Sequence, residues 1–179
     1  MNGTGPVIYT IGHATHPIDE FIRILAAHGV ETIVDVRTIP RSRHNPQFNR
    51  ETLPGSLAAA GIGYVHASGL GGLRRPRGTE LNAGWRNASF RGYADYMQTP
   101  EFAEALTGLI ESARSSRTAI MCAEAVPWRC HRSLVADALV ARGIAVEHIM
   151  SAAARKPHTL TPFAKVDGDS ITYPTETLI

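Results

Sequence analysis

The chain contains few cysteines and little net charge, and it has no long apolar run. Two cysteines in 179 residues are too few for a disulfide scaffold, so both are expected to be free thiols. No apolar run approaches the ~18 residues that cross a membrane. The segment Met1–Pro6 also lacks the basic and apolar regions of a secretory signal. These absences predict a cytoplasmic protein that does not interact with membranes.

Chain length and charge restrict the class of protein further. With 179 residues the chain can bury one sizeable core, so we expect a single domain over 1–179, with a core over 7–150 and an extension over 151–179. The formal net charge of +2 does not by itself predict nucleic-acid binding. Positive charge is nevertheless concentrated, because nine arginines and only three acidic residues lie between Asp35 and Tyr93.

Strand-like apolar runs alternate with amphipathic helix patterns along the chain. Strands are predicted over 7–11, 32–36, 62–66, 118–122 and 144–149. Helices are predicted to begin at Pro17, around Pro54, at Pro100 and near Cys130. This alternation predicts an α/β fold with three layers, in which helices cover both faces of a mostly parallel sheet of about five strands. A turn signal within 165–173 predicts a small C-terminal hairpin.

The connection over 67–92 is rich in glycine and arginine and is long for a passive loop. Four aromatic residues interleave with the arginines of this part of the chain, and they are Phe48, Trp85, Phe90 and Tyr93. Guanidinium groups beside aromatic rings favour a ligand that carries both phosphate and a base. We therefore expect a phosphate-bearing small molecule or nucleotide as partner, or a nucleic acid, with 69–91 acting as a lid.

Polar residues follow the predicted strands at their carboxyl ends. Ligands bind at these ends in parallel sheets, because the connections diverge there. The residues at or near these ends that could contribute to a site are Gly12, His13, Asp35, Arg37, His66, Cys122, Glu124 and His148. We expect them to converge on one site.

The segment Cys122–Arg132 holds both cysteines and leads into a predicted helix. The N-terminal end of a helix favours an anion or a thiolate, and flanking arginines act in the same direction. Cys130 is therefore favoured as the reactive thiol, with Glu124 and His13 as the other catalytic candidates, and Cys122 is expected to be more structural. The residues expected to bind substrate are Gly12, Asp35, Arg37, Cys122, Arg129, His131 and Arg132.

Three motifs stand in order along the chain. They are Thr10-Ile-Gly-His13, Asp35-Val-Arg37 with a following Pro40, and Cys122-Ala-Glu124 with Cys130-His-Arg132. With these motifs the chain resembles the family catalogued as Domain of Unknown Function 488. The resemblance supports the fold and the location of the site, and it implies no particular reaction. Ala14 departs from the pattern, because similar sequences commonly carry a serine after the histidine.

The candidate site residues indicate that the protein is an enzyme. We expect a hydrolase or transferase that uses a cysteine or a glutamate on a phosphorylated or nucleotide-like substrate. One alternative is a non-catalytic nucleic-acid accessory module, and another is a metal-binding or thiol-redox protein. No cofactor or metal is expected, because structural zinc sites use two closely spaced ligand pairs and only one adjacent Cys-His pair exists here.

Overall fold

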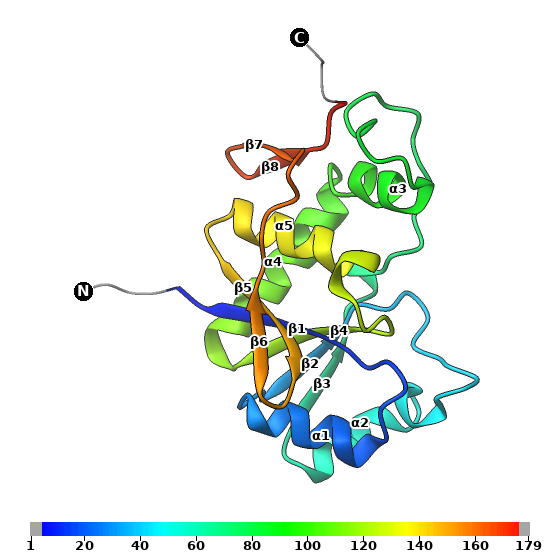
Figure 1. The fold of residues 1–179 in the computed structure, drawn as a ribbon, viewed down its shortest axis with the longest axis vertical. Helices are drawn as coiled ribbons and strands as arrows, with labels where there is room; N and C mark the ends of the chain where they lie inside the picture. The colour runs from blue at the N-terminus through cyan, green and yellow to red at the C-terminus, as the bar shows by residue number, and fades with distance from the viewer. Residues whose placement is uncertain (1–4, 176–179) are drawn as a thin grey trace.

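A six-stranded sheet organises the computed structural model, which describes residues 5–175 (Figure 1). The strands are β1 (Val7–Gly12), β2 (Thr32–Asp35), β3 (Gly63–His66), β4 (Thr118–Cys122), β5 (Ala145–Ser151) and β6 (Ala154–Pro157). Their order across the sheet is β3-β2-β4-β1-β5-β6. The first five are parallel and β6 runs antiparallel to β5. This confirms the predicted mostly parallel sheet.

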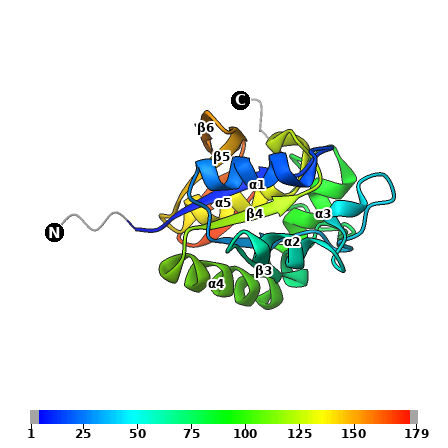
Figure 2. The ribbon, with the colours of Figure 1, turned by 90° about the horizontal axis from the view of Figure 1, so that it is seen from below.

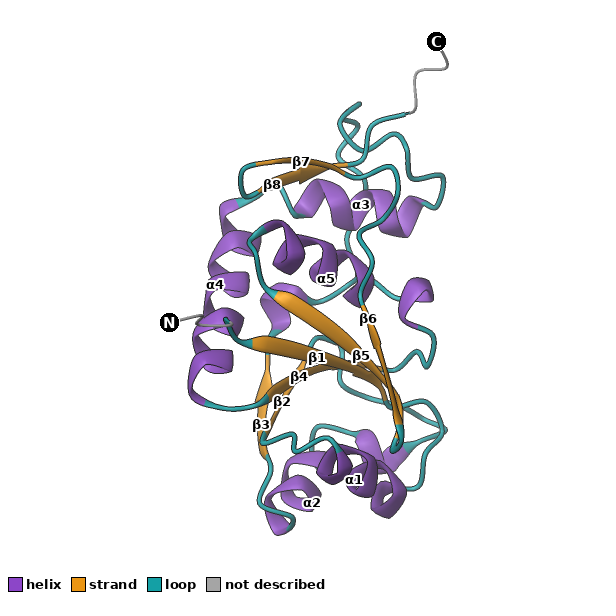
Figure 3. Ribbon diagram, turned by 60° about the vertical axis from the view of Figure 1, so that its left-hand side comes forward, coloured by secondary structure: helices purple, strands orange, loops and turns teal. Residues whose placement is uncertain are grey.

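Helices cover both faces of the sheet, so the predicted three layers are confirmed (Figure 3). One face carries α1 (Ile18–Ala27) and α2 (Leu53–Ala59), and the other carries α3 (Ala88–Tyr96), α4 (Pro100–Ser115) and α5 (Arg132–Ala141). Seen from below, α1 lies over the β1 and β5 side of the sheet and α2 over the β3 side (Figure 2). Among residues 5–175, no helix is long and apolar enough to cross a membrane.

Side chains from the two faces of β1 pack into two separate hydrophobic cores. Tyr9 and Ile11 pack into the cluster beneath α1 and α2, whereas Ile8 packs into the cluster that α3, α4 and α5 cover. Successive residues of a strand point to opposite faces, so Thr10 and Gly12 share the α5 face with Ile8. Residues that end the strands on this face therefore lie close to the start of α5.

The C-terminal hairpin is formed by β7 (Lys165–Asp167) and β8 (Ser170–Thr172), as predicted. Gly168 provides the positive φ of +60° that its turn requires. The hairpin lies beyond α5, on the side away from the sheet (Figure 1). The chain is anchored there by the fully buried Tyr173 and by Gln98, whose Nε2 donates to the Ile171 carbonyl at 2.7 Å.

Three elements differ from the sequence-based expectation. β6 is an exposed edge strand without an apolar run, so no burial pattern marks it. The helix α3 occupies part of the expected loop, and the Asn87 side chain caps it by accepting from the Ser89 and Phe90 amides. α5 begins at Arg132, because the short 3-10 helix η3 (Pro127–Arg129) and the extended backbone of Cys130 precede it.

Candidate functional site

An open cavity of about 470 Å³ lies at the carboxyl ends of β2 and β4. These strand ends face right in Figure 1. The chain after β2 contributes Arg37, Thr38, Ile39 and Arg41, the chain after β4 contributes Cys122, Ala123 and Glu124, and the approach to α5 contributes Arg129, Cys130 and His131. The remaining wall comes from Gly72, Leu73, Asn87, Ser89 and Phe90.

The structure divides the ten predicted site residues into two groups. Six of them line the cavity, and these are Arg37, Cys122, Glu124, Arg129, Cys130 and His131. The other four are buried behind its wall, and these are Gly12, His13, Asp35 and Arg132. Two residues that the sequence placed at the same site are absent from this lining. His148 lines a different cavity, and His66 Nε2 donates to the Arg37 carbonyl at 2.8 Å.

Gly12 lets β1 approach the loop that follows β4. His13 N donates to the Cys122 carbonyl at 2.9 Å, and Ala14 N donates to the Ala123 carbonyl at 3.0 Å. A Cβ atom on Gly12 would lie 1.8 Å from the Glu124 carbonyl oxygen, which no side chain can accommodate. Ala14 then turns the chain with a φ of +47°, a strained conformation for a residue with a Cβ.

Asp35 and Arg37 form a buried ion pair that fixes the floor of the site. Arg37 Nε and Nη2 donate to the two carboxylate oxygens of Asp35 at 2.9 and 2.7 Å. Nη2 also donates to the Phe48 carbonyl at 2.7 Å, and the Tyr64 hydroxyl donates to Asp35. Bidentate pairs of this kind hold a guanidinium in one orientation. Because Asp35 balances its charge, Arg37 attracts an anion only weakly. Its fixed guanidinium can instead orient a ligand that forms a hydrogen bond with it.

His13 supports Arg37 and does not line the cavity. Its Nδ1 donates to the Ala14 carbonyl at 2.8 Å, so in the neutral ring Nε2 accepts from Arg37 Nη1 at 3.3 Å. The ring stacks on Phe48 with centroids 4.2 Å apart. Burial lowers the pKa of His13 to about 4, so the ring is neutral at pH 7. His13, which the sequence predicted as a catalytic candidate, therefore lies behind Arg37 and outside the cavity lining.

Cys122 and Cys130 are close enough to influence each other's ionisation, and their side chains are 2% and 8% exposed. Burial alone would raise the pKa of Cys122, but the Cys130 thiol, the Arg132 charge and the Glu124 backbone together lower it below its ordinary value. The hydrogen bond to Cys122, with burial, raises the pKa of Cys130 far above its ordinary value. As a thiol, Cys122 donates only one long bond, to the Glu124 carbonyl at 3.5 Å. The ionisation balance therefore favours Cys122 as the thiolate, whereas the sequence favoured Cys130.

Arg132 is the largest fully buried side chain among residues 5–175, at 1% exposure. Its Nη2 donates to the Ala125 carbonyl at 3.0 Å, but Nε and Nη1 have no hydrogen-bond partner within the described part of the chain. A guanidinium stays charged in proteins, and a buried charge without compensation costs several kcal/mol. The Arg132 charge acts to lower the pKa of both Cys122 and Cys130, because a positive charge favours a nearby thiolate.

His131 lies between the thiols and the β2 end of the cavity. Its Nε2 donates to the Val36 carbonyl at 2.9 Å, and its Nδ1 lies 3.5 Å from Cys130 Sγ. Burial lowers the pKa of His131 to about 4, so this ring is also neutral at pH 7. Gly72 packs directly against it, because a Cβ there would lie 2.5 Å from Nδ1.

Glu124 and Arg129 are exposed at the mouth of the cavity. Glu124 Oε1 accepts from the Val126 amide at 3.4 Å. Among residues 5–175, Glu124 forms no ion pair with Arg129 or Arg132. Its carboxylate therefore remains available to a ligand or to a water molecule in the cavity.

The arginine-rich connection forms a wall of the cavity and is anchored at several points. The buried Asp95 accepts from Arg77 N at 2.7 Å, from Thr79 Oγ1 at 3.0 Å and from Asn82 Nδ2 at 2.8 Å. Arg74 lies 3.7 Å from the centroid of the Tyr96 ring. These contacts hold the middle of the expected lid to α3.

Several cavity residues were not predicted from the sequence. They are Thr38, Ile39, Arg41 and Ala123, whereas Gly72, Leu73, Asn87, Ser89 and Phe90 belong to the segment 69–91 that was expected to be a lid. Asn87, Ser89 and Phe90 belong to the start of α3, where the Asn87 cap was the signal that could have located them. Among residues 5–175, no three His, Cys, Asp or Glu side chains gather as ligands of a metal would.

The fold and the cavity define an α/β protein with a pair of thiols and several arginines at the carboxyl end of a parallel sheet. The family model described as Domain of unknown function DUF488 matches residues 17–139, which is more than half of the chain. The protein belongs to this family. The matched segment includes the Asp35 and Cys122 motifs and begins after the Thr10 motif. No curated protein and no solved structure matches the chain.

We predict that Gly12→Ala displaces the loop after β4, because the new Cβ would overlap the Glu124 carbonyl. Urea unfolding should show a loss of about 2–3 kcal/mol. Gly55→Ala is the matched control, because a Cβ there meets no atom within 4 Å and the residue lies inside α2. That control should be neutral or stabilising by about 0.5–1 kcal/mol. Equal stabilities of the two variants would contradict the close approach at Gly12.

We predict that stability falls as the pH is lowered from 6.5 to about 4. His13 and His131 stay neutral in the folded protein down to pKa values of about 4, whereas in the unfolded chain they bind protons near the ordinary 6.5. The unfolded state therefore gains protons first, and each histidine contributes a slope of at most about 1.4 kcal/mol per pH unit. His13→Gln should reduce this slope in urea unfolding, and substitution of the exposed His44 should not. Identical slopes in both variants would exclude His13 as a source.

Proposed function

We propose that the protein is an enzyme that attacks a phosphate-bearing small molecule with the thiolate of Cys122. The observation that carries the proposal is the position of Cys122 and Cys130 together on the wall of an open cavity, beside the buried Arg132 charge that acts to lower the pKa of Cys122. A thiolate is the nucleophilic form of cysteine, and ionisation at neutral pH distinguishes reactive cysteines from structural ones. Cys130 then serves as the hydrogen-bond donor that holds the thiolate.

The charges around the cavity favour an anionic substrate. Arg41 and Arg129 are exposed at its edge, and Arg37 is held in a fixed orientation by Asp35. The N-terminal end of α5 adds the positive end of a helix dipole beside Cys130 and His131. Among residues 5–175, Glu124 alone contributes an acidic side chain to the lining. Phosphate is the anion that several arginines and a helix N-terminus bind best.

The proposed reaction is hydrolysis of a phosphate monoester in two steps. The sulfur of Cys122 forms a bond to phosphorus while the bond from phosphorus to the leaving oxygen breaks. That oxygen takes a proton from solvent water in the open cavity, and the proton that Glu124 gains in the second step returns to solvent. Glu124 then takes a proton from a water molecule, whose oxygen attacks phosphorus and displaces the sulfur as thiolate. The products are an alcohol and inorganic phosphate, and the enzyme returns to its starting state.

We expect the purified protein to release inorganic phosphate from at least one member of a panel of phosphate monoesters and nucleotides. Cys122→Ser should reduce turnover more than about 1,000-fold, because it removes the nucleophile. Glu124→Gln should reduce it about 100-fold or more. Cys130→Ser should retain more activity than Cys122→Ser, because a hydroxyl can still donate to the thiolate. Unchanged turnover in Cys122→Ser would remove the proposed chemistry.

Two arginines of one loop provide a matched test of anion binding. Arg41 lines the cavity, whereas Arg43, two residues later, is exposed outside it. Arg41→Gln should raise KM about tenfold with a smaller effect on kcat, and Arg43→Gln should change neither. An equal rise of KM in both variants would indicate general electrostatic attraction in place of a built anion site.

A thiol-redox function is the second candidate, because the two thiols are adjacent and their pKa values are shifted in opposite directions. This is the pattern of an attacking thiolate with a partner thiol that resolves the mixed disulfide. Oxidation by hydrogen peroxide would convert the two thiols into one Cys122–Cys130 disulfide and the peroxide into two water molecules.

We expect mild peroxide treatment to remove both free thiols together, with a mass loss of two hydrogens and no dimer. In Cys122→Ser and Cys130→Ser the remaining thiol cannot form this bond, so these variants are the controls. Persistence of two free thiols in the treated wild-type protein would exclude the redox candidate and leave the hydrolase proposal intact.

A nucleic-acid accessory role receives less support from the side chains. Phe48 and Tyr93 are fully buried, so they cannot stack on a base. Arg74 lies over the Tyr96 ring, and Arg91 Nε donates to the Trp85 carbonyl at 3.0 Å. Saturable, salt-sensitive binding of an oligonucleotide, with no turnover of any phosphate monoester, would favour this alternative over the enzyme.

A further inference from the structure

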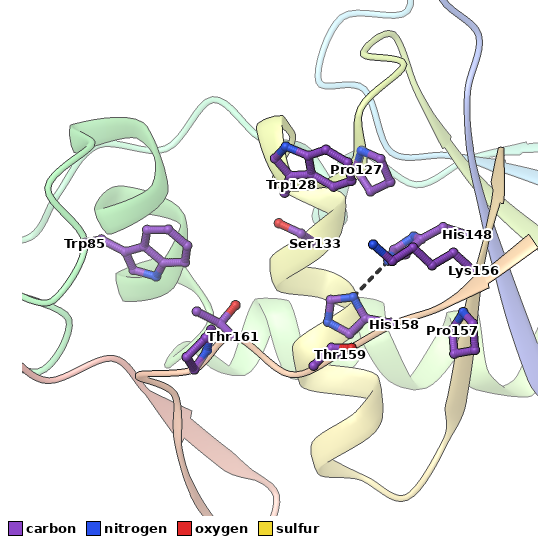
Figure 4. Close-up of a pocket in the computed structure, with 11 residues that line it drawn as sticks. Trp85, Pro127, Trp128, Ser133, His148, Lys156, Pro157, His158, Thr159 and Thr161 are labelled. Carbon is purple, nitrogen blue, oxygen red and sulfur yellow. Dashed lines mark hydrogen bonds between the residues drawn. The ribbon is translucent and has the colours of Figure 1, made fainter.

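A second cavity, of about 350 Å³, lies on the other side of the segment 127–133 (Figure 4). Pro127, Trp128 and Ser133 from this segment line it, whereas Arg129, Cys130 and His131 from the same segment line the first cavity. The segment is therefore a wall of both cavities. No sequence pattern predicted a ligand for this second cavity.

A chain of hydrogen bonds fixes the floor of the second cavity. His158 Nε2 donates to Asp137 at 2.7 Å, which leaves Nδ1 of the neutral ring as an acceptor for His148 Nε2 at 2.8 Å (Figure 4). His148 Nδ1 in turn accepts from the Thr10 hydroxyl at 2.5 Å. Each bond sets the direction of the next, so both imidazole rings are held in one orientation.

Asp137 ends this chain in a fully buried position behind His158. Its carboxylate also accepts from Thr161 N at 3.1 Å, from Thr161 Oγ1 at 2.7 Å and from the Tyr173 hydroxyl at 2.7 Å. Four donors satisfy the carboxylate, as buried charges require. Asp137 is thus occupied in holding the floor and the C-terminal extension, and it is absent from the cavity lining.

The polar groups of the lining are suited to an anion. Lys156 and the two histidines line the cavity, and none of its lining residues is acidic. The Trp85 indole N–H is buried and has no acceptor among residues 5–175, so it is a donor without a partner. An anion in the cavity would therefore meet the Lys156 ammonium group and, among residues 5–175, no acidic side chain.

The apolar part of the lining is suited to a flat ring. Trp85, Trp128 and three prolines contribute most of it, and Lys156 Nζ lies 5.5 Å from the centroid of the Trp128 ring. Aromatic faces favour stacking or edge contacts with a planar partner. The volume lies within the range of sites for small molecules.

We propose that this second cavity is a binding site for a small aromatic carboxylate. The ring lies against the Trp128 indole and the prolines, and the carboxylate accepts from the Lys156 ammonium group. Because the segment 127–133 also carries Cys130 and Arg132, a ligand there contacts the back of the wall that holds the thiol pair. The proposal concerns a site separate from the thiol cavity and does not depend on the reaction proposed there.

Tryptophan fluorescence reports on this cavity selectively, because the chain has only two tryptophans and both line it. Benzoate should change the emission saturably and raise the thermal unfolding midpoint, since a ligand that binds the folded state stabilises it. Cyclohexanecarboxylate, with the same charge and a ring that is not flat, should bind several-fold more weakly. Inorganic phosphate should leave the emission unchanged.

Lysine variants supply the decisive controls. Lys156→Met should weaken benzoate binding about tenfold, because a charge-assisted hydrogen bond is lost. Lys165→Met removes the other lysine of the chain, which lies on the exposed hairpin, and should leave the affinity unchanged. Absence of saturable benzoate binding, equal affinity for cyclohexanecarboxylate, or full affinity in Lys156→Met would each overturn the proposal.

Discussion

Arg132 carries a charge into the interior, and no carboxylate among residues 5–175 forms an ion pair with it. Its guanidinium is 1% exposed, and one backbone carbonyl satisfies only part of its donors. Leaving such a charge uncompensated would cost several kcal/mol. The group that it favours in ionised form is the sulfur of Cys122. The strands β1 and β4 and the start of α5 bring these two residues together.

That architecture comes from both sequence neighbours and distant strands. β1 and β4 pair in parallel up to Gly12 and Cys122, and the amide of His13 continues the pairing to the Cys122 carbonyl. α5 starts with Arg132, so the helix and the strand ends meet at the sulfur. A second arginine, Arg37, follows the opposite design, because Asp35 balances it completely and makes it part of the scaffold. Arg37 thus belongs to the scaffold of the site, whereas the Arg132 charge acts on the ionisation of Cys122.

The sequence predicted the layers well, because buried parallel strands and amphipathic helices leave strong local patterns. It located the cavity for the same reason, since strand ends are visible in the sequence. It did not predict α3 or β6. The residues of β6 are all exposed and α3 contains Gly92, so neither segment shows a clear buried-strand or amphipathic-helix pattern. The choice between Cys122 and Cys130 also needed the structure. Arg129 and Arg132 are close to Cys130 along the chain, but a pKa depends on burial and on contacts in space.

A direct titration of the thiols tests the central claim, which is that Cys122 carries the thiolate. Thiolate absorbs in the ultraviolet, so absorbance can be followed against pH in the wild-type protein, in Cys122→Ser and in Cys130→Ala. The account predicts a titration below the ordinary thiol pKa of 9 in the wild type, its disappearance in Cys122→Ser, and its shift to higher pH in Cys130→Ala. A low titration that persists in Cys122→Ser and disappears in Cys130→Ala would contradict the account.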